Sequence, residues 1–373
     1  MSADTTQDAI LPAAYWEGRH VPNDADSSVG EDLKSSTAST TSSVLAYRTL
    51  HGRRYHNDRV TDGEYWGPND DQHSQSVDLV HHCLCLIFDG KLTQAPLEKG
   101  KVKNVLDVGT GTGTWAIDFA DEYPDCQVVG TDISPIQPTW VPPNCRFEIE
   151  DATKPWTFAA DLFDFVHMRY IYGRWECGRL GCPVRRDVPR YQARRLGRDD
   201  GAVLPVRVGQ QQHRPGTVLY EWGKVFNESG KRSGRTFSVV EDELQEKGLK
   251  AAGFVDLKVI EGKVKMPEPF PFWHSFALTD GLQSPLTGFM KAKKWKEIGT
   301  YSPWAFEQDI EGYALFIFTH VMGWTPEQTR VYAAAFRKQL RGPNCHPYFR
   351  YNVVVARKPE NKLEEEKSEE STA

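Results

Sequence analysis

Strand-like and helix-like patterns alternate along the middle of this chain. Asn104 to Val108 suits a buried strand, with Asp107 near its end, and glycines then alternate with threonines at Gly109, Gly111 and Gly113. Apolar residues recur after this turn at helical spacing, at positions 115, 116, 119, 120 and 123. A strand, a glycine turn and a helix in direct succession predict the opening unit of an α/β nucleotide-binding fold.

Two further predicted strands end on a carboxylate. Cys126 to Asp132 is the first, and Arg146 to Asp151, followed by Ala152, is the second. Carboxyl ends of parallel strands meet at one edge of a sheet, where α/β folds bind ligands. A carboxylate such as Asp132 can accept hydrogen bonds from both hydroxyls of a ribose. The pattern therefore predicts a nucleoside-binding edge.

The glycine spacing discriminates between nucleotide ligands. A dinucleotide fingerprint, G-x-G-x-x-G, would need glycine at position 114, where this chain has Thr114. The order D-x-G-x-G-x-G from Asp107 to Gly113 instead resembles the first motif of class I S-adenosylmethionine-dependent methyltransferases. A nicotinamide-dependent oxidoreductase is an alternative that Thr114 disfavours.

A longer string of motifs resembles the fungal LaeA-type methyltransferases, which include regulators of secondary metabolism. The resemblance spans roughly residues 47–173 and 216–358. Besides Asp107–Gly113, it rests on Arg53–His56, Gly63–Trp66, Pro68–Asp70, Asp78–His82, Gly130–Pro138 and Trp140–Cys145. It implies S-adenosyl-L-methionine as the cofactor. The residues it implies are Asp107, Gly109, Gly111 and Gly113 for the methionine end, Asp132 for the ribose, and Asp151 and Ala152 for the adenine, with Thr110 and Ile133 as further cofactor-binding residues.

The expected fold class is α/β, with a Rossmann-like, mostly parallel seven-stranded sheet and an antiparallel last strand. The expected organisation is a disordered tail (1–43), an N-terminal helical cap (44–100), a methyltransferase core (101–265), C-terminal helices with a closing strand (266–358) and a charged disordered tail (359–373). Helices are predicted at Val77–Phe88, capped by Ser74 or Ser76, and at Tyr313–His320 and Pro326–Leu340.

One stretch of the predicted core, residues 174–214, departs from the pattern. It holds ten of the chain's 24 arginines and no lysine, and it shows neither helical nor alternating periodicity. The fifth strand should lie here, but Pro205 argues against a central position for the nearest candidate, Val203–Val208. Three readings stay open: a basic loop that contacts an acidic partner or nucleic acid, a divergent insertion, or a compensated frame shift. The sharp flanks and the arginine-only basicity favour the frame shift.

Composition narrows the functional classes. A net charge of −6 and a pI near 6.0 give no general electrostatic reason for binding nucleic acid or an anionic membrane. No apolar run reaches the length of a membrane span. Seven cysteines without a framework spacing fit a reducing compartment, so a cytoplasmic or nuclear location is expected.

No catalytic residue or metal site can be assigned from the residues alone. His167 and Tyr170 should lie near the sheet's carboxyl edge, but a histidine inside an apolar strand is more often a core residue. Tyr65 and Trp66 could cover the cofactor, although packing is the simpler role. His81 to Cys83 and Cys85 invite a metal interpretation, but no second ligand pair with suitable spacing follows, so no metal is expected.

The sequence therefore predicts a methyltransferase that modifies an unknown small-molecule or protein acceptor. Regulatory protein partners are a further expectation that the resemblance allows. The alternative is a non-catalytic interaction protein that keeps the fold, because the unusual stretch 174–214 should adjoin the acceptor site.

Overall fold

The computed structural model describes residues 47–57, 65–159, 162–171, 195–200, 207–208, 217–265, 286–342 and 347–359. The chain divides into two compact units, each formed by separate stretches of sequence. Unit 1 comprises Met1–Leu86, Val203–Ser233 and Lys263–Phe349, and unit 2 comprises Ile87–Ala202, Gly234–Gly262 and Arg350–Ala373.

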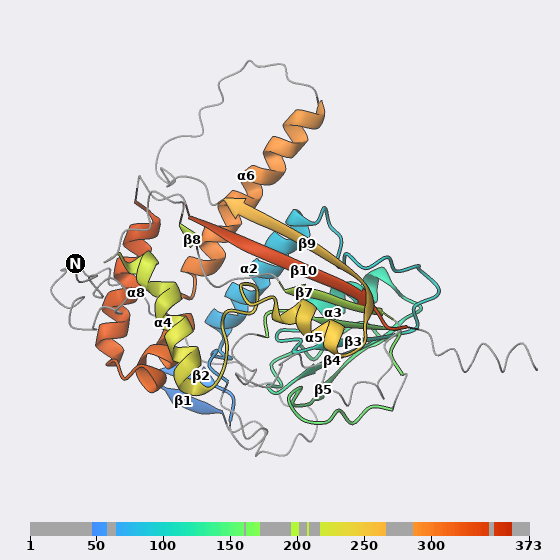
Figure 1. Ribbon diagram of the computed structural model, residues 1–373, viewed down its shortest axis with the longest axis horizontal. Helices are drawn as coiled ribbons and strands as arrows, with labels where there is room; N and C mark the ends of the chain where they lie inside the picture. Colours follow the sequence, from blue (N-terminus) through green and yellow to red (C-terminus); the bar gives the residue numbers. More distant parts are fainter. Residues whose placement is uncertain are drawn as a thin grey trace, which may run out of the picture. The chain divides into compact units, whose positions relative to one another are not determined.

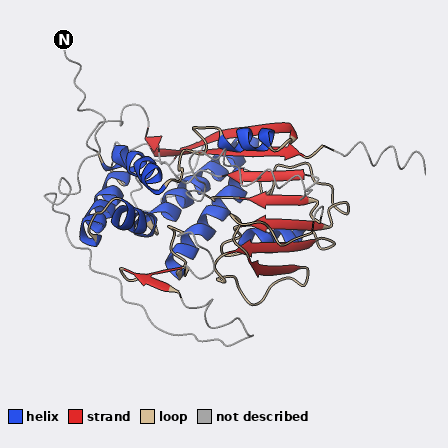
Figure 2. Cartoon of the chain, turned by 60° about the horizontal axis from the view of Figure 1, so that its bottom comes forward, coloured by secondary structure: helices blue, strands red, loops and turns tan. Residues whose placement is uncertain are grey.

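A mostly parallel sheet is the framework of unit 2 (Figures 1 and 2). Its order begins β5 (Cys145–Ile149), β4 (Gln127–Asp132), β3 (Asn104–Val108), β6 (Phe165–Met168), β7 (Arg195–Asp200) and β10 (Pro347–Arg357). The pairs from β5 to β7 are parallel, and β10 is antiparallel to β7. β9 (Val255–Lys265) also pairs with β10. The first residues of β10, Pro347 and Tyr348, belong to unit 1 and pair there with the short β8 (Arg207–Val208). This arrangement confirms the predicted α/β fold class.

The fifth strand lies within the stretch 174–214, where it was expected, but not at the nearest candidate from the sequence, Val203–Val208. Within the stretch 174–214, the strand between β6 and β10 is Arg195–Asp200, whereas Arg207 and Val208 pair only with the first residues of β10. Backbone hydrogen bonds to two neighbours hold β7 in place, and its polar sequence carries no apolar alternation that would reveal it. The other residues of 174–214 lie outside the described part of the chain. The frame shift stays a hypothesis that resequencing the transcript would test.

Apolar side chains cover both faces of the sheet in unit 2. Along β3, Leu106 and Val108 belong to one buried cluster, whereas Val105 belongs to another, as strand alternation requires. The helix α3 (Thr114–Glu122) adds Trp115 and Phe119 to the cluster on the Val105 side. The helix predicted from the spacing after the glycines is therefore present, and α5 (Leu244–Ala251) contributes Leu249 to the opposite cluster.

Unit 1 contains a hairpin and a set of helices with an aromatic core. The hairpin joins β1 (Arg48–Leu50) and β2 (Arg53–Tyr55), and the helices are α2 (Asp71–Ile87), α4 (Val218–Ser233), α6 (Leu286–Glu307), α7 (Ile310–Phe316), the π-helix η4 (Ile317–Val321) and α8 (Pro326–Leu340). Trp222 is fully buried, with ring centroids 4.7 Å from Phe336 and 4.8 Å from Phe226. Among the described residues, no helix has the length and apolar character needed to span a membrane.

Two helix predictions for unit 1 need correction. The helix predicted at Val77–Phe88, α2, starts earlier, at Asp71, because Asp70 accepts a hydrogen bond from the N–H of His73 (3.1 Å) and so caps the first turn. Ser76, one of the two expected caps, instead donates to the carbonyl of Ala305 (2.6 Å). The predicted helix Tyr313–His320 is an α-helix only as far as Phe316 and then widens into η4. The start of α8 is as predicted, with Thr325 in a capping box.

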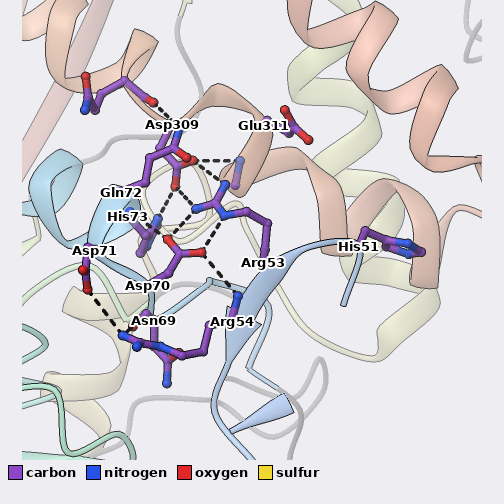
Figure 3. Close-up of polar contacts among 12 residues, drawn as sticks. His51, Arg53, Arg54, Asn69, Asp70, Asp71, Gln72, His73, Asp309 and Glu311 are labelled. Carbon is purple, nitrogen blue, oxygen red and sulfur yellow. Dashed lines mark hydrogen bonds and ion pairs between the residues drawn. The ribbon is translucent and has the colours of Figure 1, made fainter. Parts of the chain in front are cut away.

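A buried charged group, the Arg53 cluster, joins three elements of unit 1 (Figure 3). The Arg53 guanidinium donates to both oxygens of Asp70 (2.6 and 2.7 Å) and to both oxygens of Asp309 (2.7 and 3.0 Å). His73 Nδ1 lies 2.8 Å from Asp309 Oδ2. Asp70 and Asp309 cap α2 and α7 respectively, since Asp309 accepts from the N–H of Gly312 (3.1 Å). One guanidinium therefore holds the first turns of two helices against β2.

The electrostatics of the Arg53 cluster favour its charged state. Burial alone would raise the pKa of Asp70, but the hydrogen bonds and charge of Arg53 outweigh burial and hold that pKa below its usual value. Burial would likewise lower the pKa of Arg53, and its hydrogen bonds to Asp70 and Asp309 raise it instead. The two carboxylates thus depend on Arg53 for compensation of their charge.

We expect Arg53→Met to lower the free energy of unfolding by about 3–5 kcal/mol, because it leaves the buried carboxylate of Asp309 and the partly buried carboxylate of Asp70 uncompensated. The adjacent Arg54 is a matched control: its side chain is 40% exposed and bonds mainly to Asn69, so Arg54→Met should cost only about 0–1 kcal/mol. Urea denaturation of both variants measures the difference. Equal losses would contradict this account of the cluster.

Candidate cofactor site

The turn between β3 and α3 is built for glycine. Gly109, Gly111 and Gly113 all have positive φ values, of 69°, 59° and 82°, which residues with a side chain rarely adopt. Gly113 directly precedes the first turn of α3. The N–H groups of a helix's first turn, with the helix dipole, favour an anionic group such as a carboxylate.

Two buried hydrogen bonds connect this glycine turn to the core of unit 2. Asp107 Oδ2 accepts from the Thr110 hydroxyl (2.6 Å), and Asp107 Oδ1 accepts from His167 Nδ1 (2.6 Å). The side chains of Asp107 and His167 are 4% and 1% exposed. The imidazole also stacks on Trp115 of α3, with ring centroids 3.7 Å apart. Asp107 therefore shapes the glycine turn from the core, and His167 occupies a core position.

Asp132 is the last residue of β4, and its carboxylate is held by backbone N–H groups. Its Oδ2 accepts from the N–H of Gly111 (2.9 Å), and its Oδ1 accepts from the N–H of Ser134 (2.9 Å). The Gln137 amide reinforces the arrangement by donating to the carbonyls of Gly111 (2.6 Å) and Ser134 (3.0 Å). Asp132 is partly exposed, and each carboxylate oxygen has capacity for a second hydrogen bond. This carboxylate is thus held in a fixed orientation at a partly exposed position on the edge of the sheet.

Asp151 and its neighbours form a third, more enclosed part of the edge. Asp151 Oδ1 accepts from both the N–H (2.9 Å) and the hydroxyl (2.7 Å) of Thr153, so the residue stabilises its own turn. Ala152 is partly buried and packs against the core of unit 2, and Ile133 is 6% exposed. Ala152 thus places a small, partly exposed apolar residue directly beside an acid, which suits the edge of a base.

The three strand ends lie together because β3, β4 and β5 are adjacent and parallel. In the registers, Val108 pairs with Thr131, and Asp132 pairs with Ile149. The residues proposed from sequence therefore lie along one edge of one sheet.

The glycines of the turn serve different purposes. A Cβ on Gly113 would lie 2.4 Å from the ring of Phe147 on β5, and a Cβ on Gly130 would lie 2.6 Å from the same ring. The absence of a side chain at both glycines therefore makes room for the Phe147 ring. A Cβ on Gly111 would meet no atom within 4 Å. Gly111 thus leaves open space where a ligand can approach the backbone, whereas Gly113 is needed for packing. Sequence reasoning treated these glycines alike and missed Phe147 and Gln137.

Two other candidate groups lie in unit 1. Trp66 is buried there, with ring centroids 6.1 Å from Phe226 and 6.3 Å from Tyr313, which is a packing role. His81 Nε2 and Cys85 Sγ, one helical turn apart on α2, approach to 3.5 Å.

We expect Gly113→Ala to destabilise the protein by about 1–3 kcal/mol more than Gly253→Ala, because only the first forces a methyl group into Phe147. Gly253 is a matched control, since its φ of 84° equals that of Gly113 within a few degrees and a Cβ there meets nothing within 4 Å. Thermal and urea unfolding of both variants test this. Equal destabilisation would show that backbone conformation alone requires Gly113.

Comparisons with known proteins identify the family to which the chain belongs. Residues 79–176 match the family described as a methyltransferase domain. The chain is 32% identical over 337 residues to the methyltransferase pytC of Aspergillus terreus, covering 88% of this chain and 93% of that protein. It is 27% identical over 320 residues to the secondary metabolism regulator LAE1 of Cochliobolus heterostrophus, covering 83% and 94%.

Among solved structures, a phosphoethanolamine N-methyltransferase of Haemonchus contortus in complex with S-adenosyl-L-methionine is 17% identical, with a TM-score of 0.37. The match covers 75% of this chain and 52% of that one. The family of the chain follows from pytC and LAE1, because their sequence similarity to this chain extends over nearly the whole length of each pair of proteins. The chain belongs to the LaeA-like class I S-adenosylmethionine-dependent methyltransferases.

Proposed function

We propose that this methyltransferase modifies a small-molecule acceptor in fungal secondary metabolism. Two kinds of relative support the proposal: pytC, whose name states only that it is a methyltransferase, and LAE1, a regulator of secondary metabolism. The higher identity, 32% against 27%, is with the relative named for an enzymatic activity, which favours a biosynthetic acceptor over a purely regulatory role. Methyl transfer to a panel of fungal metabolites, with a protein extract as the competing substrate, tests this choice.

The observation that carries the cofactor assignment is the oriented carboxylate of Asp132. It is held by two backbone N–H groups at the end of β4, beside the open space over Gly111. In this assignment Asp132 accepts the ribose hydroxyls, with Ile133 beside the sugar. The glycine turn, shaped by Asp107 and Thr110, receives the methionine end, and Asp151 with Ala152 borders the adenine.

The reaction places a modest demand on the protein. Bound S-adenosylmethionine supplies an electrophilic methyl group on a sulfonium. The chain's own residues must fix the cofactor and hold an acceptor atom in line with that methyl group. Positioning of this kind can contribute roughly 7–11 kcal/mol toward the barrier. The fixed turn over Asp107 and His167 provides the rigidity that such positioning requires.

The wider biological setting is part of the same proposal. It includes action in the cytoplasm or nucleus, because seven cysteines without a framework spacing fit a reducing compartment, and it includes regulatory protein partners, because two relatives are named as regulators of secondary metabolism. The net charge of −6 argues against direct binding of nucleic acid. Imaging of a tagged copy and affinity purification in a fungal host test these two points.

We expect Asp132→Ala to weaken binding of S-adenosylmethionine by at least about tenfold, since it removes the ribose acceptor, a loss of ~1.4 kcal/mol or more. Asp164 offers a matched control: its carboxylate also accepts from two backbone N–H groups, those of Lys103 (2.8 Å) and Asn104 (3.1 Å), but at the opposite end of β3. Calorimetric titration should show near-normal affinity for Asp164→Ala. Equal affinities of the two variants would refute the ribose assignment.

A further inference from the structure

The segment after β6 lies beside the glycine turn and has no role in the cofactor assignment. Val108 pairs with Met168 at the ends of β3 and β6, so the residues that follow each strand emerge at the same edge. Arg169 and Tyr170 are the first residues past this pair, and both are partly exposed. They therefore lie at the ligand-binding edge, next to the expected methionine end of the cofactor.

This segment is attached to the glycine turn on both sides. Before it, His167 bonds to Asp107 (2.6 Å). After it, Ile171 packs directly over Gly109, where an added Cβ would lie 3.2 Å from the Ile171 side chain. Between these two attachments the chain cannot move independently of the cofactor turn.

Tyr170 is held in an unfavourable backbone conformation. Its φ is 56°, which is rare for an aromatic residue and costs on the order of 1–3 kcal/mol. Such conformations persist where the surroundings impose them, and they concentrate at ligand-binding sites. The two attachments on either side supply that constraint here.

The chemistry of the segment is cationic and aromatic. The Arg169 guanidinium lies 5.7 Å from the centroid of the Tyr170 ring, in a cation–π arrangement. A guanidinium stays protonated and recognises carboxylate-like oxygens through two parallel hydrogen bonds. A tyrosine hydroxyl can donate to the same oxygen. A protonated amine, in contrast, would be repelled by Arg169.

We infer that Arg169 and Tyr170 bind the acceptor, and that the acceptor presents an anionic oxygen of the carboxylate, enolate or phenolate kind. The inference rests on the proposed function. The acceptor loses its acidic proton to solvent before reaction. A lone pair of the oxygen then attacks the methyl carbon, a C–O bond forms, and the C–S bond breaks with its electron pair going to sulfur. The products are a methyl ester or ether and S-adenosylhomocysteine.

A binding experiment on the full chain separates this inference from the cofactor assignment. S-adenosylhomocysteine is titrated first, and failure to bind would overturn the proposed function and the inference with it. Ligand-observed NMR on the loaded protein then compares benzoate, its neutral counterpart benzamide and the cation benzylamine. We expect benzoate to bind at least about tenfold more tightly than benzamide, with no binding of benzylamine.

Substitutions of Arg169 and Tyr170 test whether these residues cause the preference for benzoate. Arg169→Gln should abolish the preference for benzoate, Arg169→Lys should retain part of it, and Tyr170→Phe should weaken it, all with unchanged affinity for S-adenosylhomocysteine. Arg146→Gln is the control, because Arg146 is an exposed arginine on β5 that pairs with Glu148 (2.9 Å). Equal binding of benzoate and benzamide, or a preference that survives in Arg169→Gln, would overturn the inference while leaving the cofactor site intact.

Discussion

The hydrogen bond between Asp107 and His167 is the interaction on which the candidate site depends. It links the ends of two parallel strands in the core of unit 2, and the second oxygen of Asp107 holds the Thr110 hydroxyl of the glycine turn. Stacking of His167 on Trp115 extends the connection to α3. A flexible, glycine-rich turn thereby becomes a fixed surface, which a cofactor that must be held in line with an acceptor requires.

The motifs that resemble LaeA-type enzymes fall into two physical groups. One group, from Asp107 to Gly113 and around Asp132, forms the cofactor edge of unit 2. The other, Arg53 and Asp70, forms half of a buried charged cluster in unit 1. The role of the second group is therefore structural, because Arg53 and Asp70 help to join the starts of two helices to a hairpin. The strand β7, paired on both sides, removes the main structural reason for reading the chain as a non-catalytic protein.

The fold class, the glycine turn and the acids at three strand ends could be predicted because each has a local pattern of spacing. Other features have no local signal. Asp309 lies 256 residues from Arg53 in the chain, so their ion pair depends on tertiary structure alone. The position of β7 depends on backbone pairing with its neighbours, and its polar residues carry no alternation. The packing role of Gly113 became visible only with Phe147 placed against it.

A crystal structure of the complex with S-adenosylhomocysteine tests the central claim most directly. The account predicts that both ribose hydroxyls lie within hydrogen-bond distance of the Asp132 carboxylate, with the amino-acid end of the ligand over Gly111 and the adenine beside Ala152. A ligand bound at another edge of the sheet, or at this edge with its ribose away from Asp132, would contradict the account.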